Sequence, residues 1–476
     1  MKATSLVHRR KQYRIVLASV VTLFLLPVVG TPSEVPHAAS IVWPSLDSTQ
    51  IPLPTGSGPW GVAFNPVNGY LYVSDTSSFN VSVINTSTNQ IVTQIPVIPG
   101  NEPIVADTAT GYVYVGSAWT TVSVISPVTN RVVATVSIPA SAGCSGGCFP
   151  QVQAYDSANG DVYVSQIDSP NNNNVSVIHN TSLVTTIPVG SGPNGAVYDP
   201  ADGNIFVANE GSLNLTIING STNRVVGQVA VWPGPGLAYD SSNKEVYVCS
   251  NAIENGQSNF VTAVNGTTDK VVATVSVGTA CGGALYDSAN DYLYITDNSR
   301  PGYGGNLANV TVIDPETNRV VLTLPVGSYP QGIAYDPLNN NIYVANAEAD
   351  TISILPQIYR LTVHESGLPS GANWSISVGN VTLSSTTSTI SFPEPAGTFA
   401  FSVPPVQNES ATPSSGTVTI ISASPSIDVT FGKGGGAGFL GLPGASGYFL
   451  LGGIAIAVGI VAAVVVIHRR RLKRQR

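Results

Sequence analysis

Charged residues are scarce in this sequence: they make up 10 % of its 476 residues, against about 25 % in an average soluble domain. Eleven of the 19 Lys and Arg residues lie within the first 14 or the last eight positions. The stretch between them holds eight basic residues and all 27 acids, so its formal charge is −19. Because such a surface repels phosphate backbones, nucleic acid is excluded as a partner.

Histidine is also rare, with five residues in the chain. Away from the basic ends only His37, His179 and His364 occur, too few for a His-ligated metal centre or for a serine nucleophile that needs a histidine base. Gly143–Gly147 matches G-x-S-x-G, but in a Gly-rich loop rather than at a strand-to-helix turn. No C-x-x-C-H haem motif occurs. The sequence therefore predicts no catalytic residue, no metal and no cofactor.

Long apolar runs occur only at the two ends. Residues 1–14 are basic and Ile15–Val29 is apolar, the pattern of a secretory signal peptide cleaved after Gly30 or Ala39, or of a retained signal-anchor, within residues 1–40. Phe449–Ile467 holds 19 residues without a charge, enough to span about 28 Å of membrane. By the positive-inside rule the basic residues 469–476 are a cytoplasmic tail behind a transmembrane helix at 448–468. We therefore expect a cell-membrane protein with an extracellular ectodomain.

A repeated unit fills the middle of the chain. Its landmark is an aromatic residue followed by Val or Ile, and successive landmarks are 41 to 49 residues apart. The seven landmarks are Tyr72, Tyr114, Tyr163, Phe206, Tyr247, Tyr294 and Tyr343. The first unit contains four short predicted strands, Gly61–Phe64, Tyr70–Ser74, Val81–Asn85 and Gln90–Pro96, separated by turn residues. Four strands per unit predict an all-β fold, a seven-bladed β-propeller over residues 41–357.

The seventh unit lacks its fourth strand, because it stops after Thr351–Leu355. Thr49–Leu53, upstream of the first unit, can supply that strand. The pairing would close the ring and cover two exposed sheet edges. A linear solenoid is the alternative, but it would need polar caps at both ends, which the sequence lacks.

The most specific motifs of the unit are Phe206-Val-Ala-Asn209, Tyr294-Ile-Thr-Asp297 and Tyr343-Val-Ala-Asn346, with Thr-Asn-x-Val-Val at Thr222–Val226 and Thr317–Val321. They resemble the YVTN-type β-propeller repeats of exported and surface-layer-like proteins of archaea and bacteria. The resemblance implies a propeller in a cell-surface setting and says little about activity. The second unit departs most from the pattern, with Tyr112-Val-Tyr-Val-Gly116.

Residues 358–432 break the period and predict a small Ig-like β-sandwich. Its expected strands are Tyr359–His364, Trp374–Val378, Ser388–Phe392, Thr398–Val403, Thr417–Ile421 and Ile427–Phe431. The opening Leu361-Thr-Val-His-Glu-Ser-Gly-Leu-Pro-Ser-Gly-x-x-Trp374 resembles a module of archaeal surface proteins, which implies a spacer or adhesion role. Residues 433–447 are Gly-rich and predict a flexible stalk before the membrane.

Four cysteines in an exported chain favour disulfides. We expect a local Cys144–Cys148 bridge in a Gly-rich loop, and Cys249–Cys281 because the loops near both residues share one face of a propeller. Free thiols are the alternative, since C-x3-C without nearby His is poor zinc spacing. Export also predicts a glycoprotein. The sequons are at Asn80, Asn85, Asn174, Asn180, Asn214, Asn219, Asn265, Asn309, Asn373, Asn380 and Asn408.

Five acids recur at one position of the unit: Asp156, Asp199, Asp240, Asp287 and Asp336. Each precedes Pro or Ser and a turn. Because an Asp side chain accepts hydrogen bonds from its own turn backbone, these acids are predicted to shape the hairpin between the first and second strands. Calcium binding is the alternative, without EF-hand spacing to support it.

The predicted binding face consists of the lead-in loops, which precede the first strand of each unit, and the loops between second and third strands. The lead-in loops place Trp60, Phe149, Trp232 and Tyr329 at what we expect to be matching positions around the channel mouth. Aromatic rings beside Asn and Ser suit contact with carbohydrate or peptide. In the alternative, these rings plug the channel and pack neighbouring blades.

These features favour a membrane-anchored, extracellular, non-catalytic surface or adhesion protein that recognises surface glycans or other envelope proteins. A propeller enzyme of the lactonase or dehydrogenase kind is the alternative, opposed by the lack of His and by Glu102 as the single acid at the lead-in loop tips. A solute-binding or sensory receptor is limited by the eight-residue tail. The scarcity of charge also suggests an acidic habitat.

Overall fold

A computed structural model describes residues 48–97, 103–117, 120–139, 149–167, 173–250, 259–277, 281–298, 308–421 and 425–433. The regular elements in these ranges are strands, and they form nine four-stranded sheets. The predictions for residues 1–40, the stalk from residue 434 onward, the transmembrane helix and the tail lie outside the described residues. Within the described ranges, no helix is long and apolar enough to cross a membrane.

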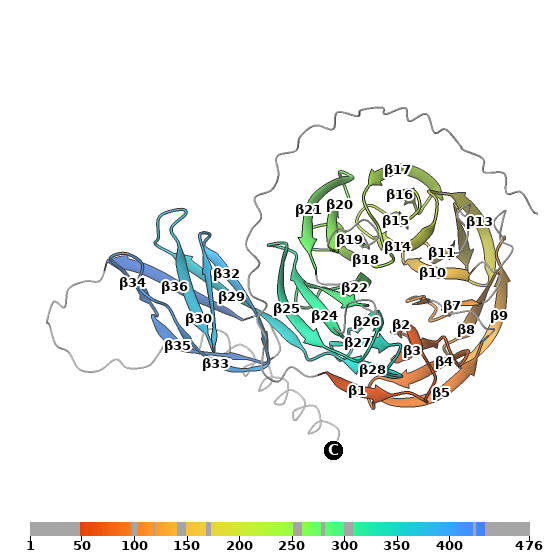
Figure 1. The fold of residues 1–476 in the computed structure, drawn as a ribbon, viewed down its shortest axis with the longest axis horizontal. Helices are drawn as coiled ribbons and strands as arrows, with labels where there is room; N and C mark the ends of the chain where they lie inside the picture. The colour runs from red at the N-terminus through yellow and green to blue at the C-terminus, as the bar shows by residue number, and fades with distance from the viewer. Residues whose placement is uncertain are drawn as a thin grey trace, which may run out of the picture.

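Seven of the described sheets follow one another between residues 49 and 354 and lie around a ring (Figure 1). In chain order the first three contain β2 (Pro59–Asn65), β3 (Tyr70–Asp75), β4 (Asn80–Asn85) and β5 (Gln90–Pro96); β6 (Ile104–Ala106), β7 (Val113–Ser117), β8 (Thr121–Ser126) and β9 (Arg131–Ser137); and β10 (Phe149–Asp156), β11 (Asp161–Ile167), β12 (Asn174–His179) and β13 (Ser182–Pro188). The next three contain β14 (Pro193–Asp199), β15 (Asn204–Asn209), β16 (Asn214–Asn219) and β17 (Arg224–Ala230); β18 (Leu237–Asp240), β19 (Glu245–Ser250), β20 (Phe260–Asn265) and β21 (Lys270–Ser276); and β22 (Cys281–Asp287), β23 (Tyr292–Asp297), β24 (Asn309–Asp314) and β25 (Arg319–Pro325). The seventh contains β26 (Pro330–Asp336), β27 (Asn341–Asn346) and β28 (Thr351–Ile354), with β1 (Thr49–Pro52) at its outer edge.

The N-terminal strand β1 joins the two ends of the ring. It pairs antiparallel with β28, with Thr49 opposite Ile354, so the prediction that the upstream segment completes the seventh unit is confirmed. Asp350, in the turn before β28, accepts the N–H groups of Gly56 and Gly58 at 2.7 and 2.8 Å and fixes the loop after β1. The first strand of the seventh sheet, β26, contacts β2 directly. At the seam between the first and seventh sheets, β1 is therefore paired with β28 and the two sheets pack against each other.

The landmark aromatics fill the spaces between neighbouring sheets. All seven are less than 2 % exposed, and each hydrophobic cluster of the ring combines residues from two adjacent sheets. Alternation along a pleated strand explains the pattern, because a residue that faces a neighbouring sheet recurs at every second position. The repeat is thus a unit that cannot bury its own apolar face alone.

In the fourth and seventh sheets the last residue of the repeated motif ties the sheet to the loop that leads into it. The side chains of Asn209 and Asn346 each donate, at 2.9 Å, to the hydroxyl seven residues further along the chain. That same hydroxyl accepts the N–H of a lead-in loop glycine, Gly190 or Gly327, at 3.3 Å. A Cβ on either glycine would lie 2.6 or 2.7 Å from the amide carbon of the motif Asn. The close approach therefore requires glycine.

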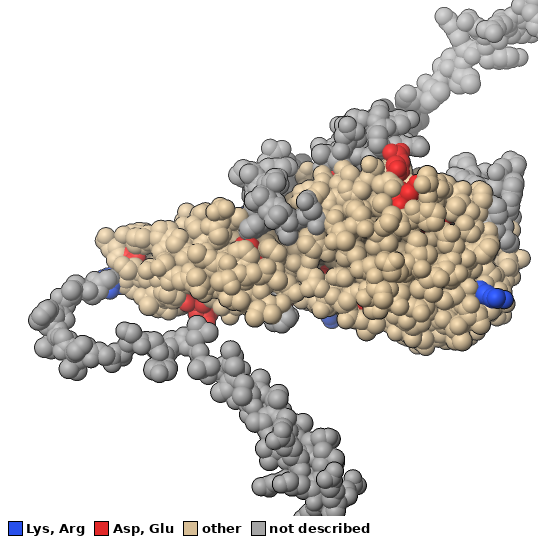
Figure 2. All heavy atoms as spheres, turned by 90° about the horizontal axis from the view of Figure 1, so that it is seen from below, with Lys and Arg blue, Asp and Glu red and all other residues tan. Residues whose placement is uncertain are grey.

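Residues 358–433 form the remaining two described sheets, which pack on one common core. The first has the order β32-β29-β36-β34, with β29 and β36 parallel, and the second has the order β31-β30-β33-β35. The strands are β29 (Ile358–Ser366), β30 (Trp374–Val378), β31 (Val381–Ser385), β32 (Thr389–Pro395), β33 (Gly397–Ser402), β34 (Glu409–Thr412), β35 (Ser415–Ile420) and β36 (Ser426–Lys433). Trp374 lies at the centre of this core, edge to face with Phe431 at 6.3 Å. We call this part the sandwich. Figure 2 shows that charged side chains are sparse on one side of the ring and the sandwich.

Candidate binding surfaces

Trp60 and Tyr329 meet across the seam between the first and seventh sheets. Trp60 is the second residue of β2, and Tyr329 directly precedes β26. Their rings are edge to face, with centroids 6.1 Å apart and planes at 75°. Both side chains stay partly exposed. The contact joins neighbouring sheets and still presents aromatic surface to solvent.

Tyr329 holds a backbone conformation that glycine adopts elsewhere in the ring. Its φ is +58°, and the φ values of Gly58 and Gly192 are +58° and +65°. The three carbonyl groups accept equivalent N–H groups just past the second strand, those of Ala347, Thr76 and Glu210, at 2.9 to 3.0 Å. A bulky residue in the left-handed region costs about 1–2 kcal/mol. Strain at a position where sister units use glycine suggests that the ring of Tyr329 has a function.

The four predicted aromatics do not all occupy matching positions, so the expectation of four matching positions was wrong. Trp60 follows the proline that pairs with the end of β3, whereas Tyr329 and Phe149 precede the corresponding prolines, Pro330 and Pro150. The reason is that the pairing of the proline with the end of the second strand sets the register, and the aromatic residues lie on different sides of that proline. The lead-in segment of the fifth sheet holds Trp232, 42 % exposed, and the structure describes Phe149 only as the first backbone position of β10.

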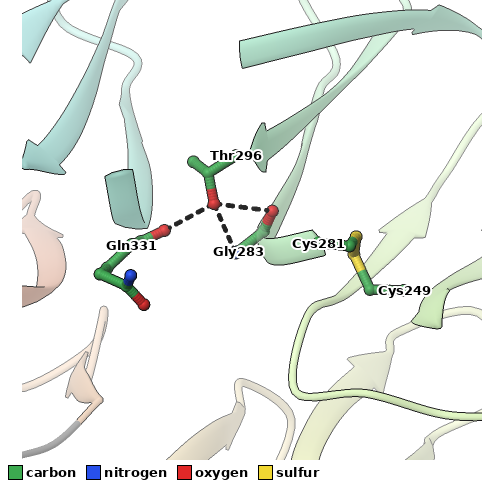
Figure 3. The surroundings of a disulfide bond; sticks show 5 residues. All are labelled: Cys249, Cys281, Gly283, Thr296 and Gln331. Atoms are coloured by element: carbon green, nitrogen blue, oxygen red, sulfur yellow. Dashed lines mark hydrogen bonds between the residues drawn. A yellow bond between two sulfur atoms is a disulfide. The ribbon is translucent and has the colours of Figure 1, made fainter. Parts of the chain in front are cut away.

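A disulfide joins Cys249 in β19 to Cys281 in β22, with the Cα atoms 5.6 Å apart. This is the pairing expected from the sequence, and it links the fifth and sixth sheets (Figure 3). Beside it, the Thr296 hydroxyl accepts the N–H of Gly283 at 2.6 Å and donates to the carbonyl of Gln331 at 2.8 Å. The sixth and seventh sheets are thereby tied together as well. Cys144 and Cys148 lie outside the described residues, as does the G-x-S-x-G segment.

The repeated acids shape turns, as the hairpin interpretation predicts. In each case one carboxylate oxygen accepts the backbone N–H two residues further on, at 2.8 to 2.9 Å; the acids are Asp156, Asp199, Asp240, Asp287 and Asp336. The described residues hold no group of three His, Cys, Asp or Glu side chains placed to share a metal ion.

A cavity of about 440 Å³ lies along the first strands of five successive sheets, β6, β10, β14, β18 and β22. Four tyrosines from equivalent positions contribute to its wall: Tyr155, Tyr198, Tyr239 and Tyr286. Each precedes the last residue of its strand, whereas Trp60 is near the start of β2. The cavity's aromatic wall and the predicted face are therefore at opposite ends of the first strands. Sequence reasoning missed this site, although the recurring Tyr-Asp pair was visible.

A carboxyl group lies beside the hydroxyl group of each of these tyrosines. Burial, and then the carboxylate beside each hydroxyl, raises the pKa of Tyr155 and of Tyr198 to about 12 and raises that of Tyr239 further. The carboxylates come from the preceding sheets and are those of Asp107, Asp156 and Asp199. Tyr286 donates to Asp291 at 2.7 Å. Because their pKa is high, these phenols stay protonated and uncharged at neutral pH.

The hydrogen bond between His179 and Asp161 has a structural explanation. His179 Nδ1 and Asp161 Oδ1 are 3.0 Å apart, and the two residues are directly opposite in the pairing of β11 with β12. Polar cross-strand neighbours that bond in this way stabilise hairpins.

The sequon asparagines lie in described parts of the chain. Asn180, Asn373, Asn380 and Asn408 are exposed. In the turns between third and fourth strands, the side-chain oxygens of Asn85, Asn219 and Asn265 accept hydrogen bonds from the residues that follow. Those hydrogen bonds use the side-chain oxygen. The amide nitrogen, which is the atom that carries a glycan, takes no part in them.

Comparison with known proteins supports the architecture. No protein-family model and no curated protein matches the chain. Among solved structures, the chain is similar to hydrazine synthase from Kuenenia stuttgartiensis, with a TM-score of 0.54 and 18 % identity over 64 % of this chain and 96 % of that chain. At this identity the similarity shows the fold alone. The four-stranded sheets of the ring fit a β-propeller.

Proposed function

We propose that this chain is a membrane-anchored extracellular recognition protein whose ring is a closed seven-bladed β-propeller of the YVTN type. On this proposal the sandwich is the archaeal surface-protein module, an Ig-like spacer between the propeller and a C-terminal transmembrane helix. The ectodomain is an extracellular glycoprotein that acts without catalysis. Its partners are surface glycans or other envelope proteins, which contact the lead-in loop face.

The observation that carries the proposal is the placement of Tyr329. A tyrosine in a left-handed backbone position keeps a strain that glycine avoids in two sister loops. The ring it places there packs edge to face with Trp60 and remains partly exposed. Rigid aromatic rings are suited to bind sugars and peptides, since they present apolar area with little entropy to lose. Trp232, 42 % exposed on another lead-in segment, adds a second aromatic contact on this face.

The test is binding of the full-length protein, in a polyoxyethylene detergent, to a glycan array and to whole cells. We expect saturable binding that is lost in the Trp60→Ala/Trp232→Ala variant, because both contacts to the ligand disappear. Leu338→Ala is the matched control, since Leu338 is 69 % exposed in a turn at the opposite end of the first strands. Lost stability with unchanged binding in the tryptophan variant would contradict the proposal, and so would equal loss in Leu338→Ala.

A further inference from the structure

The tyrosine-walled cavity has a chemistry that the lead-in loop face does not share. Its volume, about 440 Å³, falls within the range of about 300–1,000 Å³ that small-molecule sites occupy. Between the tyrosines the wall is formed by apolar residues such as Val197 and Leu237, with Gln153 as one polar side chain. The Gln153 amide already donates to the carbonyl of Asn194, at 3.4 Å. The surface available to a ligand is therefore largely aromatic and aliphatic.

Carboxyl groups lie beside the tyrosines of this cavity. The four tyrosine hydroxyls are next to the carboxylates of Asp107, Asp156, Asp199 and Asp291. No Lys or Arg is among the described residues that line the cavity. Asp199 and Asp240 are fully buried, and each has one oxygen without a hydrogen-bond partner in the described part of the chain. The described lining therefore places no cation opposite these carboxyl groups.

Aromatic faces and uncompensated carboxylates together select for a positive charge. A cation over the face of a tyrosine ring is attracted by the ring's quadrupole, and a carboxylate behind the hydroxyl adds a longer-range Coulomb attraction. A primary ammonium ion would lose its strong hydration without gaining hydrogen-bond acceptors from an apolar wall. A quaternary or methylated ammonium group carries its charge on an apolar surface and loses little.

We propose that the cavity formed by Tyr155, Tyr198, Tyr239 and Tyr286 binds a small organic cation with a quaternary or methylated ammonium group. The site is separate from the lead-in loop face and does not depend on the recognition role proposed above. A neutral sugar, which could also stack on tyrosine, would gain nothing from the carboxylates, so charge distinguishes the two ligand classes.

The test uses calorimetric titration of the full-length protein in a polyoxyethylene detergent. The two probes are choline and 3,3-dimethylbutan-1-ol, the uncharged isostere in which a carbon atom replaces the nitrogen of choline. We expect choline to bind and the isostere to bind at least about tenfold more weakly, because only the cation interacts with the ring quadrupole and the carboxylates. Equal binding of the two probes would overturn the proposal. So would the absence of saturable choline binding below about 10 mM, a concentration well above the dissociation constants of ordinary small-molecule sites.

Variants locate the site. Tyr198→Leu and Tyr239→Leu should each weaken choline binding about tenfold, and Tyr198→Phe, which keeps the ring, should weaken it much less. Tyr335→Leu is the matched control, because Tyr335 is the counterpart in β26 and does not line the cavity. If a leucine variant fails to fold, Asp156→Asn keeps the turn acceptor and should still weaken binding about threefold by removing one charge. Equal loss in Tyr335→Leu, or no loss in any wall variant, would overturn the assignment.

Discussion

Arg360 of the sandwich strand β29 donates a hydrogen bond to Asp314 at the end of propeller strand β24, with Nη2 and Oδ1 3.0 Å apart. The same nitrogen donates to the carbonyl of Asp291 at 2.7 Å, and the guanidinium lies 4.4 Å from the ring centre of Tyr292. Arg360 is 8 % exposed, so its charge is removed from water and depends on these partners. All of them belong to the sixth propeller sheet. This side chain therefore holds the sandwich against the sixth sheet, beside Ile358 of the same strand, which packs in the cluster between the sixth and seventh sheets.

Replacing Arg360 should therefore uncouple the two parts. Arg360→Ala leaves the Asp314 carboxylate buried without its cation, and we expect a loss of about 3–5 kcal/mol in the free energy of unfolding. Calorimetry should then show separate transitions for propeller and sandwich where the parent shows one. Arg319→Ala, an exposed arginine at the start of the next strand, is the control and should change stability by less than about 0.5 kcal/mol. A similar change in the free energy of unfolding in both variants would contradict the role of Arg360 between the propeller and the sandwich.

A side chain at Gly190 or Gly327, the lead-in loop glycines that approach the motif Asn, should destabilise the fold. Gly190→Ala would place a methyl group 2.6 Å from the Asn209 amide carbon, and we expect a loss of about 1–3 kcal/mol from the forced shift. Chemical denaturation measures it. Gly432→Ala, where no atom lies within 4 Å of the added carbon, should be neutral. If both substitutions were neutral, the bond network from the motif Asn to the loop would be looser than described.

The free energy of unfolding should decrease as the pH rises from about 4 to 8. Burial raises the pKa of Asp287 to about 6, of Asp75 to about 7 and of Glu394 to about 8. A carboxyl whose folded pKa lies above its unfolded value binds its proton more tightly when folded. Its stabilising contribution is therefore complete below the unfolded pKa, near 4, and is lost as pH rises through the folded pKa. Melting curves across this range test the trend, and a steep fall in stability between pH 6 and 3 would refute it together with the expected acidic habitat.

Glu394 offers a single-residue test of that trend. It is fully buried in the sandwich, and neither carboxyl oxygen has a hydrogen-bond partner among the described residues. Glu394→Gln keeps the shape and cannot ionise, so it should raise stability at pH 9 by about 2 kcal/mol while changing it little at pH 5. Asp428→Asn, at an exposed position of β36, should have no such pH-dependent effect. An identical response in both variants would place the titration elsewhere.

The sequence predicted those features that repetition encodes. The period revealed the four-stranded units, the short seventh unit revealed the role of β1, and the pairing of Cys249 with Cys281 followed from loops on a shared face. Strands β31 and β34 were missed because both are short and partly exposed: β31 alternates over only two apolar residues, and β34 contains a single apolar residue. The tyrosine-walled cavity was missed for another reason: Tyr198 and its counterparts become one wall only when separate units curve into a ring. The Arg360 joint likewise depends on contacts that no local pattern reports.

The remaining prediction separates recognition from packing at Tyr329. Replacing it by glycine removes the ring and also relieves the left-handed strain, which is about 1–2 kcal/mol. The lost edge contact with Trp60 is worth a similar amount, so we expect Tyr329→Gly to unfold within about 1 kcal/mol of the parent. Binding to the array, in contrast, should fall about tenfold or more.

The reciprocal control is Gly192→Ala, which adds strain at the sister position (φ +65°) and should destabilise the fold without affecting binding. A variant Tyr329→Gly that loses more than about 2 kcal/mol and still binds normally would assign the ring to the seam between sheets. If stability is kept and binding is lost, the strain at Tyr329 serves the ligand.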